Sequence, residues 1–593
     1  MNDLLDLPLE PALILQKKRA LKRELAAREG LVPKRVAILS GSTVGEIKNV
    51  LEVLLLAQGI RPEFYVGGYG LFYENLVFDD GSLAAFAPDF IYIHTSLRNL
   101  KTLPCPADSE PDAQAKQDAE FARFETAARA ALGFGCPVIL NNFELPAWRV
   151  MGNRDAVDAR GKVRFVRQLN ERLAALAQST PNLYLNDLAY LQALYGMDRF
   201  SDQTAWYAYK YCCAIDCISY LCQSVANIIK SLLGKNKKAL ALDLDNTLWG
   251  GVVGDDGPEG LVLGSESPAG MAYSEFQAYL KELGQLGVLL NVCSKNEAAN
   301  AEAGLARADS LLRRDDFVSF KANWEPKHLN LAAMAQELNL LPDSFVFVDD
   351  NPAEREIVRQ QLPAVAVPEL GAPEEYIAAL DRRGYFEVTT LSADDRKRAD
   401  MYKQNAQRAA LEQNFANYGD YLKSLEMVGE FGPFDSAHAE RITQLINKTN
   451  QFNLTTRRYT PAEVEALIGD NGHITLYGRL VDKFGDNGIV TALIGEVQGD
   501  ILDIQLWIMS CRTFKRRLEH ALFDELVAEA ARRGIRRIVG HYRPTAKNLL
   551  VKDFYATIGF EKAAEDEAGN CTFEFTGIEG YRPQCGVMQI KHV

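Results

Sequence analysis

Short apolar runs alternate with amphipathic stretches over the first 230 or so residues. The apolar runs lie at residues 35–39, 63–66, 90–93 and 137–140. Helical patterns separate them, and a charged amphipathic helix is expected over residues 1–30. Strands that alternate with helices predict a parallel sheet with helices on both faces.

The same alternation begins again after the polar stretch 234–238, with apolar runs at 239–242, 288–292 and 344–348. Residues 373–425 are strongly charged and helical in composition, which is typical of a connector. Strands are expected at 474–479, 488–494, 501–509 and 537–540, with a helix at 514–533 between the last two. We therefore predict α/β domains at 1–234 and 235–372, a helical connector at 373–425, and an antiparallel α+β domain at 426–593.

Composition and charge limit the classes of function that this protein can have. The net charge of −14 argues against nucleic-acid binding and against an anionic membrane surface. We find no signal-peptide pattern and no apolar run of the roughly 20 residues that a membrane helix needs. The ten cysteines form no paired C-x-x-C array, which favours a reducing compartment. A cytoplasmic protein is the expectation.

Two carboxylates mark the end of the first strand in the second domain. Asp243 and Asp245 are two residues apart, so both side chains point to the same face of a strand. The carboxyl end of a parallel strand opens into the crevice where α/β sheets bind ligands. Two carboxylates there repel each other, and Mg²⁺, which prefers oxygen ligands, would relieve the repulsion.

Three later features strengthen the interpretation of these two aspartates as part of a functional site. Cys293 and Ser294 end the next apolar run, Lys327 follows a proline near a helix start, and Asp349 with Asp350 ends the run at 344–348. In this order, over residues 237–370, the features resemble the four motifs of the haloacid-dehalogenase (HAD) superfamily. The gaps between the motifs, of about fifty and about thirty residues, have no room for a cap domain. An open site of this kind admits a tethered or macromolecular substrate, or is covered by neighbouring domains.

The resemblance implies a role for each of these residues. It makes Asp243 the nucleophile that forms an aspartyl-phosphate, and Asp245 the general acid and base. It implies that Ser294 and Lys327 stabilise the phosphoryl oxygens. Mg²⁺ is expected on Asp243, Asp245 and Asp349, with Asp350 left open as a further ligand.

Longer strings narrow the resemblance to the FkbH-like subgroup of HAD proteins. They lie at residues 243–257, 292–296, 349–355, 447–453, 482–486 and 509–512. Members of this family are similar to enzymes that take a glyceryl-phosphate unit from 1,3-bisphosphoglycerate, dephosphorylate it and load it onto the phosphopantetheine thiol of an acyl carrier protein. The resemblance therefore implies an acyl carrier protein or carrier domain as partner and a phosphorylated three-carbon substrate.

Acyl transfer of this kind calls for a cysteine nucleophile. Cys293 is the first candidate, although neighbouring strand residues point to opposite faces, so Cys293 and Ser294 should not both enter one site. Cys511, at a strand end before a helix, is the second. Either is equally interpretable as a buried thiol, and the choice stays open.

The flanking domains carry further resemblances. The first is similar to SGNH hydrolases, with Ser42 at the nucleophile position and Asn141 or Asn142 in the oxyanion block. Residues 197–233 contain no histidine to act as the base, and His94 is interpreted as structural, so we expect a non-catalytic module. The last domain resembles GNAT acyltransferases, but residues 512–519 contain no glycine for close approach to a pyrophosphate. Their cations are instead expected near a phosphopantetheine phosphate, with acyl delivery and a folded spacer as the open alternatives.

The predicted fold class is α/β and multidomain: a flavodoxin-like SGNH-type domain, a Rossmann-like capless HAD domain and an α+β GNAT-like domain. The predicted function is HAD-type dephosphorylation coupled to glyceryl transfer. The alternatives are a Mg-dependent phosphatase for a sugar or polyol phosphate, and a non-catalytic assembly module.

Overall fold

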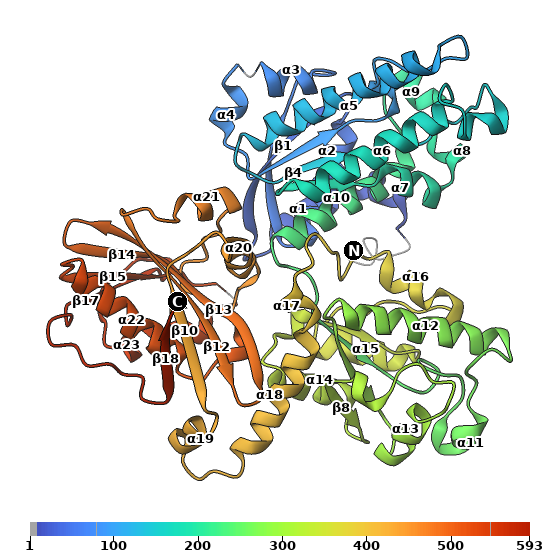
Figure 1. The fold of residues 1–593 in the computed structure, drawn as a ribbon. Coiled ribbons are helices and arrows are strands. Elements are labelled where there is room, and N and C mark those ends of the chain that lie inside the picture. The colour runs from blue at the N-terminus through green and yellow to red at the C-terminus, as the bar shows by residue number, and fades with distance from the viewer. Residues whose placement is uncertain (1–8, 79, 546) are drawn as a thin grey trace. The chain divides into compact units, whose positions relative to one another are not determined.

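The computed structural model describes residues 9–78, 80–545 and 547–593, and these residues form three β-sheets (Figure 1). The chain divides into two compact units, Met1–Leu232 and Leu233–Val593. Each unit is described by itself.

The first unit is built on a five-stranded parallel sheet of order β2-β1-β3-β4-β5. The strands are β1 (Val32–Ser40), β2 (Ile60–Val66), β3 (Phe90–His94), β4 (Val138–Asn141) and β5 (Leu183–Asn186). The helices are α1 (Pro11–Ala26), α2 (Gly45–Ala57), α3 (Phe72–Val77), α4 (Ser82–Phe86), α5 (Glu110–Leu132), α6 (Lys162–Ser179), α7 (Leu188–Tyr195), α8 (Met197–Phe200), α9 (Gln203–Tyr209) and α10 (Ile218–Leu232). The predicted parallel α/β fold is confirmed, and β5 is an additional strand. Of the helix expected over residues 1–30, residues 1–8 lie outside the described residues.

The second unit begins with a four-stranded parallel sheet of order β8-β7-β6-β9. The strands are β6 (Ala239–Leu242), β7 (Leu289–Ser294), β8 (Ser319–Ala322) and β9 (Phe345–Val348). The helices are α11 (Val253–Gly260), α12 (Pro268–Gln285), α13 (Ala298–Leu305), α14 (Lys327–Glu337), α15 (Pro352–Gln361) and α16 (Tyr376–Asp381). Every residue of β6, β7 and β9 is buried, as expected for parallel strands covered on both faces.

Helices α17 (Ala393–Arg396), α18 (Arg398–Glu412) and α19 (Tyr418–Ser424) follow this sheet. Arg408 on α18 forms a buried two-point ion pair with Asp482, at 2.8 and 2.6 Å. Bidentate guanidinium–carboxylate pairs fix geometry as well as charge. The pair therefore anchors α18 to the sheet that contains Asp482.

That sheet has nine strands, in the order β16-β17-β15-β14-β13-β12-β10-β18 with β11 beside β14. The strands are β10 (Met427–Gly432), β11 (Phe452–Asn453), β12 (His473–Asp482), β13 (Gly485–Gln498), β14 (Ile501–Met509), β15 (Arg537–Tyr542), β16 (Glu561–Glu565), β17 (Cys571–Phe575) and β18 (Met588–His592). The helices are α20 (Ala439–Lys448), α21 (Pro461–Ala466), α22 (Leu518–Arg532) and α23 (Phe554–Thr557). The expectation of a purely antiparallel sheet is wrong, because β14 pairs with β15, and β10 with β18, in parallel.

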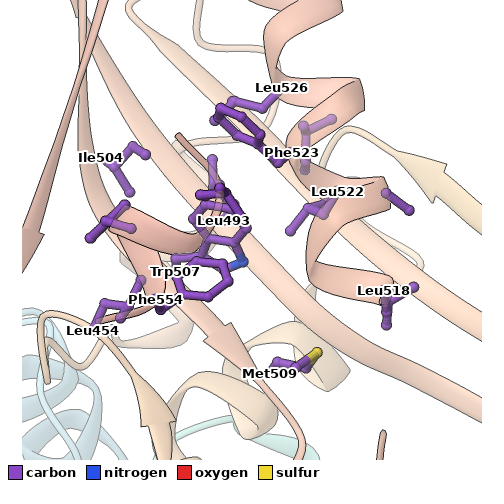
Figure 2. Packing of buried hydrophobic residues seen from close by; sticks show 14 of the residues in the cluster. Leu454, Leu493, Ile504, Trp507, Met509, Leu518, Leu522, Phe523, Leu526 and Phe554 are labelled. Atoms are coloured by element: carbon purple, nitrogen blue, oxygen red, sulfur yellow. The ribbon is translucent and has the colours of Figure 1, made fainter. Parts of the chain in front are cut away.

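A large apolar core joins α22 to this sheet (Figure 2). Trp507 on β14 is fully buried between Phe523 of α22 and Phe554 of α23, with ring centroids 6.3 and 4.9 Å away. Leu518, Leu522 and Leu526 continue the apolar stripe of α22 at helical spacing. The stripe determines which face of α22 packs on the sheet.

None of the helices among the described residues is both long and apolar enough to cross a bilayer. All ten cysteines are free, so no disulfide contributes to the fold.

Candidate active site at the carboxyl edge of the second sheet

Polar side chains gather where β6, β7 and β9 end, because these neighbouring parallel strands finish at the same edge of the sheet. Asp243 follows β6, and its backbone N–H donates to the Val348 carbonyl at 2.9 Å, which continues the pairing with β9. A pocket of about 210 Å³ opens at this edge. Its lining is polar throughout and consists of Asp243, Asp245, Asn246, Ser294, Lys295, Lys327, Asp350, Asn351 and Glu354.

The Lys327 ammonium connects two of the carboxylates. Lys327 is the first residue of α14, and its Nζ lies 3.0 Å from Asp243 Oδ2 and 2.5 Å from Asp349 Oδ2. All three side chains are buried. Burial alone would lower the pKa of Lys327, but the two carboxylates outweigh it and raise the pKa above its ordinary value. The site therefore holds a permanent cation beside Asp243.

Asp243, Asp349 and Asp350 have carboxylate oxygens within 4.8 Å of one another. Burial and the nearby Asp243 charge raise the pKa values of both Asp349 and Asp350. One ammonium does not neutralise three acids, and a hard divalent cation with oxygen ligands would complete the charge balance. This donor set fits Mg²⁺, and it includes Asp350, which the sequence left open.

Asp245, which was expected among the metal ligands, is outside this group of three. Its Oδ1 accepts hydrogen bonds from Trp249 Nε1 at 2.9 Å and from the Val253 N–H at 3.0 Å. Its Oδ2 accepts one from Asn296 Nδ2 at 2.8 Å. Burial raises the pKa of Asp245, although these donors oppose the shift. A carboxyl group that lines the pocket and is fixed in this way is suited to proton transfer.

No role was predicted for Trp249, Asn296 or Asn246, although all three lie in the strings 243–257 and 292–296. Asn246 has a φ of +54° and accepts a hydrogen bond from the Gly251 N–H at 3.0 Å, which closes the loop after the two aspartates. An asparagine next to Asp245 was a usable signal, since asparagine tolerates the left-handed conformation better than other non-glycine residues. Asn296 and Trp249 approach Asp245 only through the folded loops.

Strand alternation separates Cys293 from Ser294. Both belong to β7, and Ser294 lines the pocket. Cys293 is fully buried in the apolar cluster that also contains Met334 and Phe347, and its Sγ lies 3.5 Å from the Lys327 carbonyl oxygen. Burial raises the pKa of the Cys293 thiol far above its usual range. The expectation of Cys293 as a catalytic residue is therefore opposed by its position on the far side of the strand.

Cys511 is also outside the residues that line the pocket. It follows β14, packs against the same apolar cluster as Cys293, and its Sγ lies 3.8 Å from Tyr402 Oη. The two cations near Cys511 differ in whether they can contact an anionic ligand. Arg516 is buried and contacts Asp482 at 3.2 Å, while Lys515 is exposed. Arg516 is therefore not available for the contact with a phosphopantetheine phosphate that was expected of residues 512–519.

In the first unit, the Ser42 hydroxyl is buried and has no hydrogen-bond partner among the described residues. No base is therefore attached to the Ser42 hydroxyl in the part of the chain that the structure describes. Asn141 is buried at the end of β4, and Asn142 Nδ2 donates to Asp187 Oδ1 at 2.7 Å.

The chain is similar to one protein family and to several solved structures. The family described as FkbH, N-terminal domain, matches residues 58–230. The crystal structure of the N-terminal part of protein BF1531 from Bacteroides fragilis, described as containing a phosphatase domain complexed with Mg, is 28% identical with a TM-score of 0.59. The match covers 63% of this chain and 99% of that one. No curated protein matches the chain.

Two acetyltransferase structures are similar to about a quarter of the chain. The ribosomal-protein-S18-alanine N-acetyltransferase from Escherichia coli is 14% identical, with a TM-score of 0.20, over 25% of this chain and 90% of that one. The acetyltransferase of the GNAT family from Streptococcus pneumoniae is 16% identical, with a TM-score of 0.21, over 25% and 98% respectively.

Proposed function

We propose, on the premise that this chain is an FkbH-like protein with a HAD-like phosphatase domain, that it dephosphorylates a glyceryl-phosphate unit and loads the glyceryl group onto a carrier protein. The unit would derive from 1,3-bisphosphoglycerate, and the acceptor would be the phosphopantetheine thiol of an acyl carrier protein. The observation that carries the phosphatase step is the buried Lys327 ammonium between Asp243 and Asp349 at the polar pocket.

The positions of the side chains support a two-step phosphatase reaction. An Asp243 oxygen attacks phosphorus, the bond to the leaving oxygen breaks, and Asp245 gives that oxygen its proton. Asp245 then takes a proton from water, which hydrolyses the aspartyl-phosphate and restores Asp243. Lys327 and the Ser294 hydroxyl bind the phosphoryl oxygens throughout.

Asp243, Asp349 and Asp350 would hold Mg²⁺. When bound, the ion supplies further charge stabilisation to the phosphoryl oxygens. The related Bacteroides fragilis structure contains Mg, which supports this assignment.

The size and lining of the pocket support a small substrate. A volume of about 210 Å³ is below the roughly 300–1,000 Å³ of pockets that bind drug-sized ligands. The lining is polar, so a short polyol phosphate suits it better than an apolar chain. Lys295 and Glu354, which form an ion pair at 2.6 Å in the lining, are the groups best placed to select among such substrates.

Carrier loading tests the proposal. The full chain is incubated with 1,3-bisphosphoglycerate, Mg²⁺ and a phosphopantetheinylated carrier protein, and the carrier is weighed by mass spectrometry. We expect a glyceryl adduct with the wild type, and an adduct that retains its phosphate, or none, with Asp243→Asn. Free phosphate beside an unmodified carrier would instead favour a phosphatase for sugar or polyol phosphates. Phosphate release that is unchanged in Asp243→Asn would favour a non-catalytic assembly module.

A further inference from the structure

The β4–α6 loop, residues 142–161, is a compact segment that follows the carboxyl end of β4 in the first unit. Hydrogen bonds within it close successive turns, and the last of these runs from the Gly161 N–H to the Asp158 carbonyl at 2.9 Å. Where the loop folds back on itself, a Cβ at Gly161 would lie only 2.1 Å from the Asp155 carbonyl oxygen. The loop therefore has a defined shape, and the fold determines where its side chains lie.

Three large apolar side chains of this loop are exposed to solvent. The exposed fractions are 63% for Trp148, 72% for Val150 and 67% for Val157. Single exposed apolar residues are ordinary, but three of them on one short loop form the kind of surface that marks an interaction site. Tryptophan is also among the residues that contribute most to binding at protein–protein interfaces.

The same segment is strongly cationic. Residues 148–167 contain six cations and two acids, an excess of four positive charges in a chain whose net charge is −14. Both acids are buried: Asp155 accepts a hydrogen bond from the Val163 N–H at 2.7 Å, and Asp158 pairs with Arg160 at 2.8 Å. None of the six cations is buried. The acids are therefore withdrawn from the surface on which the cations lie.

Other groups of cations in the chain have acids beside them. Lys22 on α1 pairs with Glu52 of α2 at 2.8 Å. Arg533, which follows α22, pairs with Glu529 of that helix at 2.7 Å. The β4–α6 loop differs because its cations outnumber its acids three to one and lie among exposed apolar groups.

The exposed arginines suit carboxylate ligands. Arg149 and Arg167 are both exposed, and Arg149 Nη1 donates to the neutral Asn153 side chain at 3.0 Å. Arg164, near the start of α6, donates to the Val157 carbonyl, which joins this end of the helix to the loop. A guanidinium group binds carboxylates in two-point geometry, and arginine and tryptophan are both enriched at protein interfaces.

We propose that the β4–α6 loop, together with the start of α6, is a docking surface for an acidic protein, with Trp148 as its apolar anchor. Such a protein offers carboxylates to the arginines and apolar groups to Trp148, Val150 and Val157. A nucleic acid presents phosphates, which leave the two valines without apolar partners. The occupant we assign, a carrier protein with an acidic surface, rests on the proposed function.

Carrier binding to the full chain tests this surface. The probe is a fluorescently labelled, phosphopantetheinylated carrier protein of net negative charge, and anisotropy gives its Kd. Trp148→Ala should raise the Kd about tenfold or more, as expected for an interface anchor. Arg149→Glu should raise the Kd several-fold at low salt, and by less at high salt, because exposed charges are screened.

Two matched controls change exposed residues elsewhere in the same unit. Phe78→Ala removes an exposed aromatic ring, and Arg19→Glu reverses an exposed cation on α1. Both should keep the wild-type Kd, and circular dichroism checks that all four variants are folded. The assignment is overturned if the wild type does not bind the carrier, if Trp148→Ala and Arg149→Glu bind it as the wild type does, or if the controls lose as much affinity.

The same variants exclude other occupants of the loop. Sedimentation of the wild type would reveal a dimer, and anisotropy with a labelled single-stranded oligonucleotide would reveal nucleic-acid binding. A dimer that Trp148→Ala dissociates, or oligonucleotide binding that Trp148→Ala abolishes, would overturn the assignment.

The two proposals fail in different ways. Glyceryl loading by Trp148→Ala with the wild-type KM for the carrier would overturn the docking surface and leave the proposed function in place. Carrier binding that depends on Trp148, without any glyceryl loading by the wild type, would support the docking surface and contradict the proposed function.

Discussion

Replacing Lys327 by methionine tests the electrostatic reasoning about the phosphatase site directly. The substitution keeps the length and apolar stem of the side chain but removes the ammonium that contacts Asp243 and Asp349. Both carboxylates are buried, so the change leaves two uncompensated charges in a region of low dielectric. Breaking a buried pair by removing one partner costs about 3–5 kcal/mol. We expect the free energy of unfolding of the phosphatase domain, in chelator, to fall by this amount.

Mg²⁺ should restore part of the loss in Lys327→Met. An ion that binds only the native state, present at 100 times its Kd, raises the free energy of unfolding by about 2.7 kcal/mol. The variant site is more negative than the wild type, so the stabilising effect of Mg²⁺ should be larger in the variant. Urea unfolding, followed by tryptophan fluorescence with and without Mg²⁺, measures both effects.

Lys295→Met is the matched control for this experiment. Lys295 lines the same pocket, but its side chain is exposed and pairs with Glu354 near the surface. Surface pairs contribute about 0–1 kcal/mol, so the control should lose little stability. Equal stability of Lys327→Met and the wild type in chelator, or an absent response to Mg²⁺ in both, would refute the reasoning.

Three further changes test other parts of the structure. Trp249→Phe removes one donor to Asp245 and should slow phosphate release about tenfold, the equivalent of roughly 1.4 kcal/mol, with a normal fold by circular dichroism. Arg408→Met leaves Asp482 without its bidentate partner and should cost about 3 kcal/mol in urea unfolding, the lower end for a buried pair because a second arginine also reaches Asp482. Burial raises the pKa of Glu144 from its ordinary value near 4.5 to about 7, so the wild type should lose stability relative to Glu144→Gln as the pH rises from 5 to 8. The expected change is about 2–3 kcal/mol, and a difference that is constant with pH would contradict it.

The strands that were predicted and those that were missed differ in their apolar content. The predicted strand at residues 501–509 coincides with β14 (Ile501–Met509), where an apolar pattern is sustained over nine residues. β5 (Leu183–Asn186) and β8 (Ser319–Ala322) have only four residues each and include half-buried positions at the edges of their sheets. Such short edge strands carry too little periodicity to be recognised. The parallel pairing of β10 with β18 depends on residues about 160 positions apart, which no local pattern encodes.

The residues of the candidate phosphatase site that stand at the ends of strands were predictable from the sequence. Asp243, Ser294 and Asp349 each stand at the end of an apolar run, and adjacent parallel strands bring such positions to one edge. The exclusion of Asp245 from the acidic group was not predictable, because it depends on hydrogen bonds from Trp249 and Asn296. These donors approach Asp245 only when the loops after two strands have folded against each other.

The period of a β-strand also limits where acyl chemistry can occur in this chain. β7 presents Ser294 to the phosphatase pocket, and the same alternation turns Cys293 into the apolar cluster behind the sheet. Moving Cys293 into the pocket would require a register shift that turns Ser294 out of it, and the pairing of β7 with both β6 and β8 opposes such a shift. One strand therefore cannot supply both the phosphate-binding hydroxyl and the acyl-accepting thiol.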